Sequence, residues 1–222
     1  SLSLTPFITL FLFEQLPEHP PTHHAKLLDS CRCLLERADV RASIFANGVL
    51  QFFYHLAPLY IPLYLHGVLG IPWSELGWMF AVMLLPFVLV EYPAGYIADR
   101  WLGEKEILIA GFAITSVSFA ALAFVTATTP LAVLLTIIVA TRIGSALVEA
   151  MVDGHFFRRV TTEDANTTTL YRMTRPVSAL VAPVSASLLL ALTGSYVVFF
   201  ITMGVLLLIL GLGSSYFIKD DS

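Results

Sequence analysis

Six long apolar stretches constrain the fold of this chain more than any other feature of its sequence. They cover residues 42–65, 75–98, 107–126, 131–152, 176–192 and 196–218. A helix of roughly 17–25 apolar residues crosses the hydrocarbon core of a bilayer and satisfies its own backbone hydrogen bonds there. The sequence therefore predicts an all-α integral membrane protein. We expect a bundle of six transmembrane helices, with successive helices antiparallel where the links are short.

The composition excludes a water-soluble fold. Of the 222 residues, 57% are hydrophobic and 13% are charged, whereas a typical soluble domain is about 25% charged. A soluble domain of this size could not hide so much apolar surface. The net charge of −4 gives no sign of nucleic-acid binding. Cys31 and Cys33 are too few for a disulfide framework and too closely spaced for an ordinary zinc site, so we expect no metal and no cofactor.

The basic residues are distributed unevenly along the chain. They precede the first span and follow the second, fourth and sixth, and they are absent from the links after the first, third and fifth. These residues are Lys26, Arg32, Arg37, Arg41, Arg100, Lys105, Arg158, Arg159, Arg172, Arg175 and Lys219. Lysine and arginine concentrate in cytoplasmic loops. Both termini are therefore predicted to be cytoplasmic, and the membrane is expected to be the plasma (inner) membrane.

Residues 1–41 differ from the rest of the chain. The stretch "SLSLTPFITLFLFEQL" contains an apolar run of only about a dozen residues, which is too short to cross a bilayer. A proline-broken polar stretch follows and leads into a predicted helix over residues 25–37. We interpret residues 1–41 as the tail of a preceding hydrophobic segment plus a cytoplasmic linker, and residues 42–222 as the six-helix bundle. An amphipathic helix on the membrane surface is the alternative for the apolar run.

A compact charged cluster, within "YPAGYIADRWLGEKEILIAGF", joins the second and third spans. Along the chain, the cluster contains in this order Gly95, Asp99, Arg100, Gly103 and Lys105. This order resembles the signature loop of the major facilitator superfamily, G-x-x-x-D-[RK]-x-G-[RK]-[RK]. In that family the loop joins the second and third helices of each six-helix half. The sequence departs from the pattern at Leu102, which is an extra residue, and at Glu104, where a basic residue is usual.

The resemblance implies a secondary active transporter, or half of one, that moves a small solute by alternating access. The family fold places the substrate path between two six-helix halves. This chain most resembles the C-terminal half, so the implied partner is a second copy or a complementary N-terminal half. The loop would act as a cytoplasmic gate. The alternative is a non-transporting membrane sensor, a scaffold or a remnant half-bundle. An enzyme is not predicted, because neither H-E-x-x-H nor G-x-S-x-G occurs.

A polar stripe runs along the first span, where Asn47, Gln51 and His55 recur every four residues and share one helical face. Polar groups that face lipid are costly, so this face should meet protein or a water-filled cavity. The resemblance implies a cavity, because the corresponding helix lines the central cavity in the family. The alternative is that these side chains form hydrogen bonds between helices.

The fourth span carries charges within the membrane. Arg142 lies near the predicted midplane, and Glu149 follows seven residues later on the same side of the helix. A buried arginine needs an anionic partner or substrate. Glu149 and Glu91, the intramembrane carboxylate of the second span, are therefore candidates for proton coupling. A static ion network that fixes helix packing is the alternative.

Small residues in the last two spans predict close helix contacts. Ser178, Ala182 and Ala186 repeat at four-residue spacing in the fifth span, and Gly204 and Gly211 share a face of the sixth. Small residues let helix backbones approach each other within a membrane. We interpret these two spans as scaffold.

Overall fold

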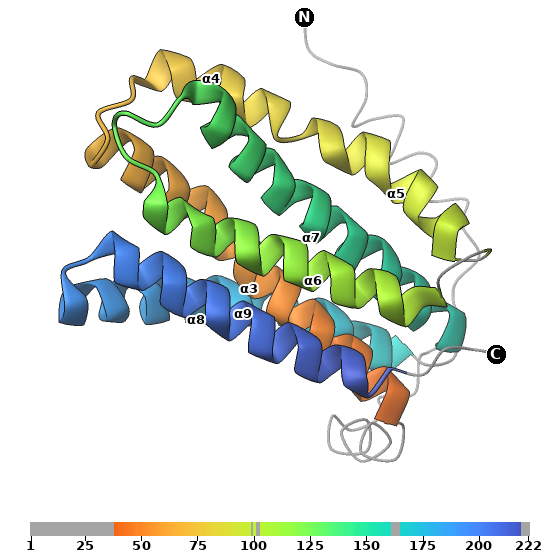
Figure 1. Cartoon of the computed structure of the whole chain (residues 1–222). Helices are drawn as coiled ribbons and strands as arrows, with labels where there is room; N and C mark the ends of the chain where they lie inside the picture. Colours follow the sequence, from red (N-terminus) through yellow and green to blue (C-terminus); the bar gives the residue numbers. More distant parts are fainter. Residues whose placement is uncertain (1–37, 99, 101–102, 161–164, 219–222) are drawn as a thin grey trace, which may run out of the picture.

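The computed structural model describes residues 38–98, 100, 103–160 and 165–218, and within these the regular elements are all helical (Figure 1). They are α3 (Ala38–Gly67), α4 (Trp73–Val82), α5 (Leu85–Ile97), α6 (Gly103–Ala121), the 3₁₀ turn η2 (Leu122–Phe124), α7 (Leu131–Arg159), α8 (Ala165–Thr193) and α9 (Tyr196–Tyr216). Together they form six segments long and apolar enough to cross a membrane, which confirms the predicted all-α, six-span fold. The helix predicted over residues 25–37, Cys31 and Cys33 lie outside the described residues.

Four helices form a row, in which α5 contacts α7, α7 contacts α3, and α3 contacts α8. Two further helices cover one face of this row. Helix α6 packs against α7, and α9 packs against α6 and α3. The beginning of α3 and the end of α9 lie at the same end of the bundle, as the orange and dark blue ribbons show (Figure 1). We call this the basic end. The described basic residues on the helix segments near it are Arg41, Arg100, Lys105, Arg158, Arg159, Arg172 and Arg175.

The second predicted span is interrupted. It was expected to be one helix over residues 75–98, but α4 ends at Val82 and α5 begins at Leu85. The cause is Pro86, which has no N–H to donate to the carbonyl of Val82 and whose ring crowds the preceding turn. Met83 and Leu84 form the link between the two helices.

The polar segment between the fourth and fifth predicted spans, which lies outside both of them, is mostly helical. Helix α7 continues to Arg159, and α8 begins at Ala165 rather than at residue 176. The added turns have a buried side. His155 and Phe156 of α7 and Tyr171 of α8 are all at most 5% exposed. Packing of this side stabilises the helix beyond the apolar stretch that the sequence pattern marks.

Glycines bring α6 close to both of its neighbours. A Cβ atom at Gly144 of α7 would lie 2.5 Å from Thr115 Oγ1 and 2.7 Å from the Gly111 carbonyl oxygen. Gly204 and Gly211 of α9 likewise face α6, where a Cβ would collide with Ala120 and Phe112. The predicted close contact through the glycines of the sixth span is confirmed, and its partner is α6.

The serine and alanine stripe of the fifth span also lies inside the bundle. Ser178, Ala182 and Ala186 are at most 6% exposed. The hydroxyl of Ser178 donates to the Gly48 carbonyl of α3 at 3.2 Å. These small side chains therefore hold α8 against α3, as the spacing predicted.

Candidate functional site

A buried carboxylate of α7 is held by a tyrosine of α3. The Tyr54 hydroxyl donates a hydrogen bond to Glu149 Oε2 at 2.7 Å. Both side chains are partly buried in the contact between the two helices. The sequence analysis identified Glu149 but missed Tyr54. The signal was available, because Tyr54 follows Asn47 by seven residues and so lies on the same helical stripe.

Arg142 lies on the same helix as Glu149, closer to the middle of the bundle. Its side chain is only 6% exposed. The guanidinium carbon lies 5.6 Å from the centre of the Phe53 ring, a distance at which a cation is attracted to an aromatic face. No salt bridge joins Arg142 to Glu149 among the described residues. The two residues are instead contacted by neighbours on α3, because Phe53 contacts Arg142 and Tyr54 contacts Glu149.

The side chains of the polar stripe of α3 form hydrogen bonds with one another's residues and with α8. Asn47 Nδ2 donates to Thr174 Oγ1 of α8 at 2.9 Å and to the Tyr171 carbonyl at 3.3 Å. Gln51 Nε2 donates to Asn47 Oδ1 at 3.5 Å. His55 Nδ1 lies 2.7 Å from the Gln51 carbonyl. Asn47 is buried and joins two helices, whereas Gln51 and His55 are partly exposed.

A second tyrosine–carboxylate pair lies closer to the basic end. The Tyr171 hydroxyl of α8 donates to Asp153 of α7. The Tyr171 ring also stacks on Phe156, with 3.9 Å between ring centres and an angle of 19° between their planes. Tyr171 was not predicted as a site residue, because it lies outside the apolar spans that the sequence marks. Since both residues are helical, this pair joins α7 to α8 in the same way as Tyr54 and Glu149 join α3 to α7.

A histidine adds a further contact between α3 and α7. His155 is 2% exposed, and its Nδ1 lies 2.8 Å from the Ser43 hydroxyl. The α3–α7 contact is therefore polar both near Arg142 and near the basic end. The other carboxylate of the prediction, Glu91, lies on α5, but its side chain is outside the described part of the structure.

The residues of the predicted gate loop surround the turn from α5 to α6. Gly103 has φ of 75°, a left-handed conformation that favours glycine, and it begins α6. Arg100 donates from Nη1 to the Tyr96 hydroxyl at 2.7 Å. The Lys105 ammonium lies 5.4 Å from the centre of the Tyr216 ring. A Cβ at Gly95 would meet nothing within 4 Å, so this glycine is not needed for packing among the described residues. Asp99 lies outside them.

Glu104, which departs from the basic residue of the family pattern, forms a salt bridge with Arg158. Glu104 is in the first turn of α6 and Arg158 is in the last turn of α7. Each charge lies at the helix end where it is favoured by the helix dipole. The departure from the pattern thus has a local structural reason.

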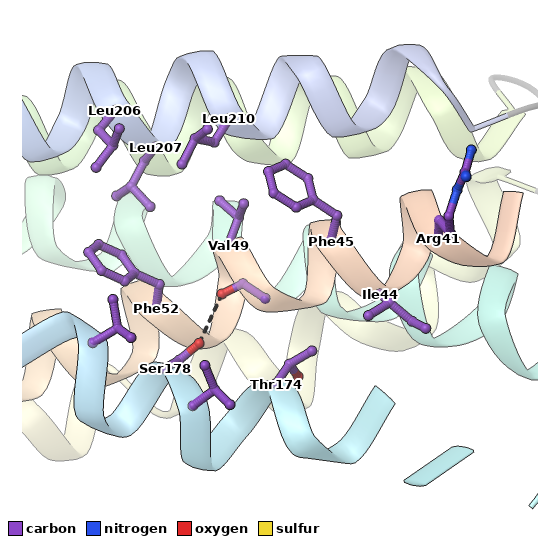
Figure 2. Close-up of a pocket in the computed structure, with 13 residues that line it drawn as sticks. Arg41, Ile44, Phe45, Val49, Phe52, Thr174, Ser178, Leu206, Leu207 and Leu210 are labelled. Atoms are coloured by element: carbon purple, nitrogen blue, oxygen red, sulfur yellow. Dashed lines mark hydrogen bonds between the residues drawn. The ribbon is translucent and has the colours of Figure 1, made fainter. Parts of the chain in front are cut away.

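A mostly apolar groove lies between α3, α8 and α9, and Thr174, the partner of Asn47, is at its edge (Figure 2). It has a volume of about 430 Å³. Figure 2 shows Phe45, Phe52 and Leu207 among its walls, and the hydrogen bond from Ser178 to the Gly48 carbonyl beneath it. That bond occupies the Ser178 hydroxyl, and Arg41 and Thr174 are the other polar residues in the lining.

The six spans are matched by a known family. A family model described as Major Facilitator Superfamily matches residues 43–222. The chain belongs to the major facilitator superfamily. None of the curated proteins matches the chain.

Membership of this family indicates a transport role for the six spans. Members of the superfamily are transporters in the membrane, so the bilayer and a small solute are the partners of this chain. In the family fold, two six-helix units enclose a path for the solute. The match covers the described bundle from residue 43, in the second turn of α3, onwards, and the described helices supply six spans.

Proposed function

We propose that this bundle is half of a secondary active transporter and that the solute moves along the face between α3 and α7 by alternating access. The observation that carries the proposal is Arg142, a cation buried at the middle of a spanning helix. It lies eleven residues into α7, or about 16 Å at 1.5 Å per residue, which is near the middle of a roughly 30 Å hydrocarbon core. Buried charge at this depth is costly and is typical of solute and ion pathways.

Glu149 is the proposed coupling group. A carboxylate can couple solute and proton movement when its protonation depends on which side the path is open to. The Tyr54 hydroxyl contacts Glu149, and the adjacent Phe53 ring contacts Arg142, so a solute bound at Arg142 would alter the surroundings of the carboxylate through these two neighbouring side chains. Gln51 and His55, which are partly exposed on the same helix, would line the path, and Glu91 would contribute from α5.

A second six-helix half would complete the path. Helices α8 and α4–α5, at the two flanks of the row, are the least buried of the six spans. Large exposed apolar side chains on α8 include Val177, Leu180, Val181, Val184, Leu188 and Leu192. These flanks offer surfaces for a second half, which would be a second copy of the chain or a complementary N-terminal half. Native mass spectrometry in lipid discs distinguishes these two arrangements from an isolated bundle.

The basic end is proposed to face the cytoplasm of a cell whose plasma (inner) membrane holds the protein, so both termini lie inside. The gate loop then lies at the cytoplasmic surface, where Asp99 would contact the opposite half when that side is closed. Replacing Asp99 by Asn removes this charge at nearly constant size. The variant should populate the inward-open state more and cycle more slowly, as cysteine labelling at the cytoplasmic mouth would report.

Proton flux in vesicles tests the function directly. The purified chain is reconstituted with an internal pH dye, and candidate solutes are added under an imposed gradient. Solute-dependent proton movement should occur in the wild type and in Arg172→Gln, which changes an exposed residue of α8. It should be lost in Arg142→Gln and Glu149→Gln. Folded, paired protein that moves no solute would instead favour a sensor or scaffold.

A further inference from the structure

Arg142 faces a cavity whose other walls are apolar. The cavity has a volume of about 280 Å³. Its lining residues besides Arg142 are Pro58, Phe80, Met83, Leu84 and Phe87. Met83 and Leu84 form the link between α4 and α5, so the helix break caused by Pro86 shapes this wall. The cavity therefore combines one positive charge with an otherwise apolar surface.

The positive charge of Arg142 is not neutralised by the described residues. None of their carboxylates forms a salt bridge with the guanidinium, whose carbon lies 5.6 Å from the centre of the Phe53 ring. An isolated buried cation is strongly unfavourable in a low-dielectric interior. A ligand with one negative charge would relieve this cost, and the guanidinium can bind a carboxylate through two parallel hydrogen bonds.

We infer that the cavity binds the solute and that the solute is a small monoanion with an apolar body, such as an aromatic carboxylate. The inference rests on the proposed transport function and adds the substrate class. The carboxylate would pair with Arg142, and the apolar body would lie against Phe80 and Phe87. Pockets for drug-sized ligands have volumes of roughly 300–1,000 Å³. A cavity slightly smaller than these suits a molecule with about one ring.

Two other classes of anion fit less well. A zwitterion such as an amino acid needs an acidic group for its ammonium, but none of the described lining residues is acidic, and Glu149 Oε2 already accepts the Tyr54 hydroxyl. A phosphate needs several donors around its oxygens. The cavity supplies one arginine and apolar walls. A second charge or a strongly polar group on the solute would be desolvated there without a partner.

Direct binding of radiolabelled benzoate to the purified full chain in lipid nanodiscs tests the inference, with empty nanodiscs as the blank. Benzoate should bind saturably. Benzamide has the same shape without the charge, and acetate has the charge without the ring. Both, together with glycine and inorganic phosphate, should compete at least about tenfold more weakly. Arg142→Gln should weaken benzoate binding by at least the same factor, whereas Arg172→Gln should leave it unchanged.

The competition series uses the wild-type protein, so it remains decisive even where Arg142→Gln fails to fold. Equal competition by benzamide, unchanged benzoate binding in folded Arg142→Gln, or no saturable benzoate binding by folded wild type would each overturn the inference. Failure of the transport proposal looks different. Normal benzoate binding without flux of any solute in vesicles would keep this site and refute transport. Flux of a neutral solute without benzoate binding would keep transport and refute this site.

Discussion

The two faces of helix α7 are built by opposite means. Towards α6, the contact consists of Gly144 against Gly111 and Thr115, with backbones so close that no Cβ fits. Towards α3, the contact consists of polar side chains, above all Tyr54 with Glu149 and Ser43 with His155. We refer to these as the glycine seam and the polar seam. Helix α7 thus has one rigid side and one side whose hydrogen bonds can exchange partners.

The difference follows from the physics of helix packing in lipid. Lipid tails are as apolar as leucine, so helices associate through close packing and hydrogen bonds rather than through burial from water. Interlocked backbones have one good arrangement, whereas a tyrosine hydroxyl can exchange its acceptor for another. We therefore expect the glycine seam to keep its form during a transport cycle and the polar seam to change.

The largest expected effect is at the glycine seam. Gly144→Ala adds a methyl group 2.6 Å from the Thr115 backbone nitrogen, and that backbone cannot move aside easily. Such overpacking typically costs about 1–3 kcal/mol and occasionally more, and contact with backbone atoms places this site at the upper end. The variant should be poorly folded, as measured by thermal melting in detergent and by yield of monodisperse protein. Gly154→Ala on the same helix meets only ordinary contacts at 3.8–4.0 Å and is the matched control. Equal melting of the two variants would contradict a rigid glycine seam.

The next largest effect separates function from folding. Arg142→Ala removes the buried cation near the polar seam and should abolish solute uptake in vesicles, by at least about a hundredfold. Truncating one partner of a buried, hydrogen-bonded charge pair costs about 2–5 kcal/mol of binding. A hundredfold loss corresponds to about 2.7 kcal/mol, which lies within this range. Insertion and melting should stay near wild type, because the glycine seam is intact. Near-normal uptake in this variant would reduce Arg142 to a packing residue.

The sequence predicted neither seam in full. Regularly spaced small residues predicted the close packing of α8 and α9, but Gly111 and Gly144, which make the glycine seam, were not predicted. The polar seam depends on pairing between distant residues. Tyr54 and Glu149 are 95 positions apart, and the charge pattern of α7 alone gave no reason to choose a tyrosine over an acid–base pair.

Helix ends and interruptions were the other weak point of the prediction. Hydropathy marks where a helix is apolar, not where it stops, so the polar turns that contain His155 and Tyr171 fell outside the predicted spans. The break in the second span had a visible cause in Pro86. The apolar residues around it nevertheless predicted one continuous span, because a hydropathy value does not account for a missing N–H.

A smaller effect is expected from weakening the polar seam itself. Tyr54→Phe keeps the ring and removes the hydrogen bond to Glu149. A hydrogen bond to a charged group contributes about 1.5–3 kcal/mol. We expect solute uptake to fall about tenfold and melting to change by only a few degrees. Tyr60→Phe is the control, because its hydroxyl bonds to Pro183 and Ser187 of α8 rather than to the charged groups. Equal loss of uptake in both variants would show that Tyr54 has no special link to Glu149.

The smallest effect is expected where a charge pair lies at the end of the glycine seam. Glu104 and Arg158 join the first turn of α6 to the last turn of α7, and the Arg158 side chain is 52% exposed. An exposed ion pair contributes about 0–1 kcal/mol and is screened by salt. Glu104→Gln should therefore lower the melting temperature slightly at low ionic strength and by less at high ionic strength.

The comparison with Gly144→Ala makes this last measurement informative. If the glycines hold α6 to α7, breaking the ion pair leaves their contact intact, and the variant still folds and transports. A loss of stability from Glu104→Gln as large as that from Gly144→Ala would mean that charge rather than close packing fixes the seam. The rigid side of α7 would then depend on ionic strength, and the contrast between its two faces would disappear.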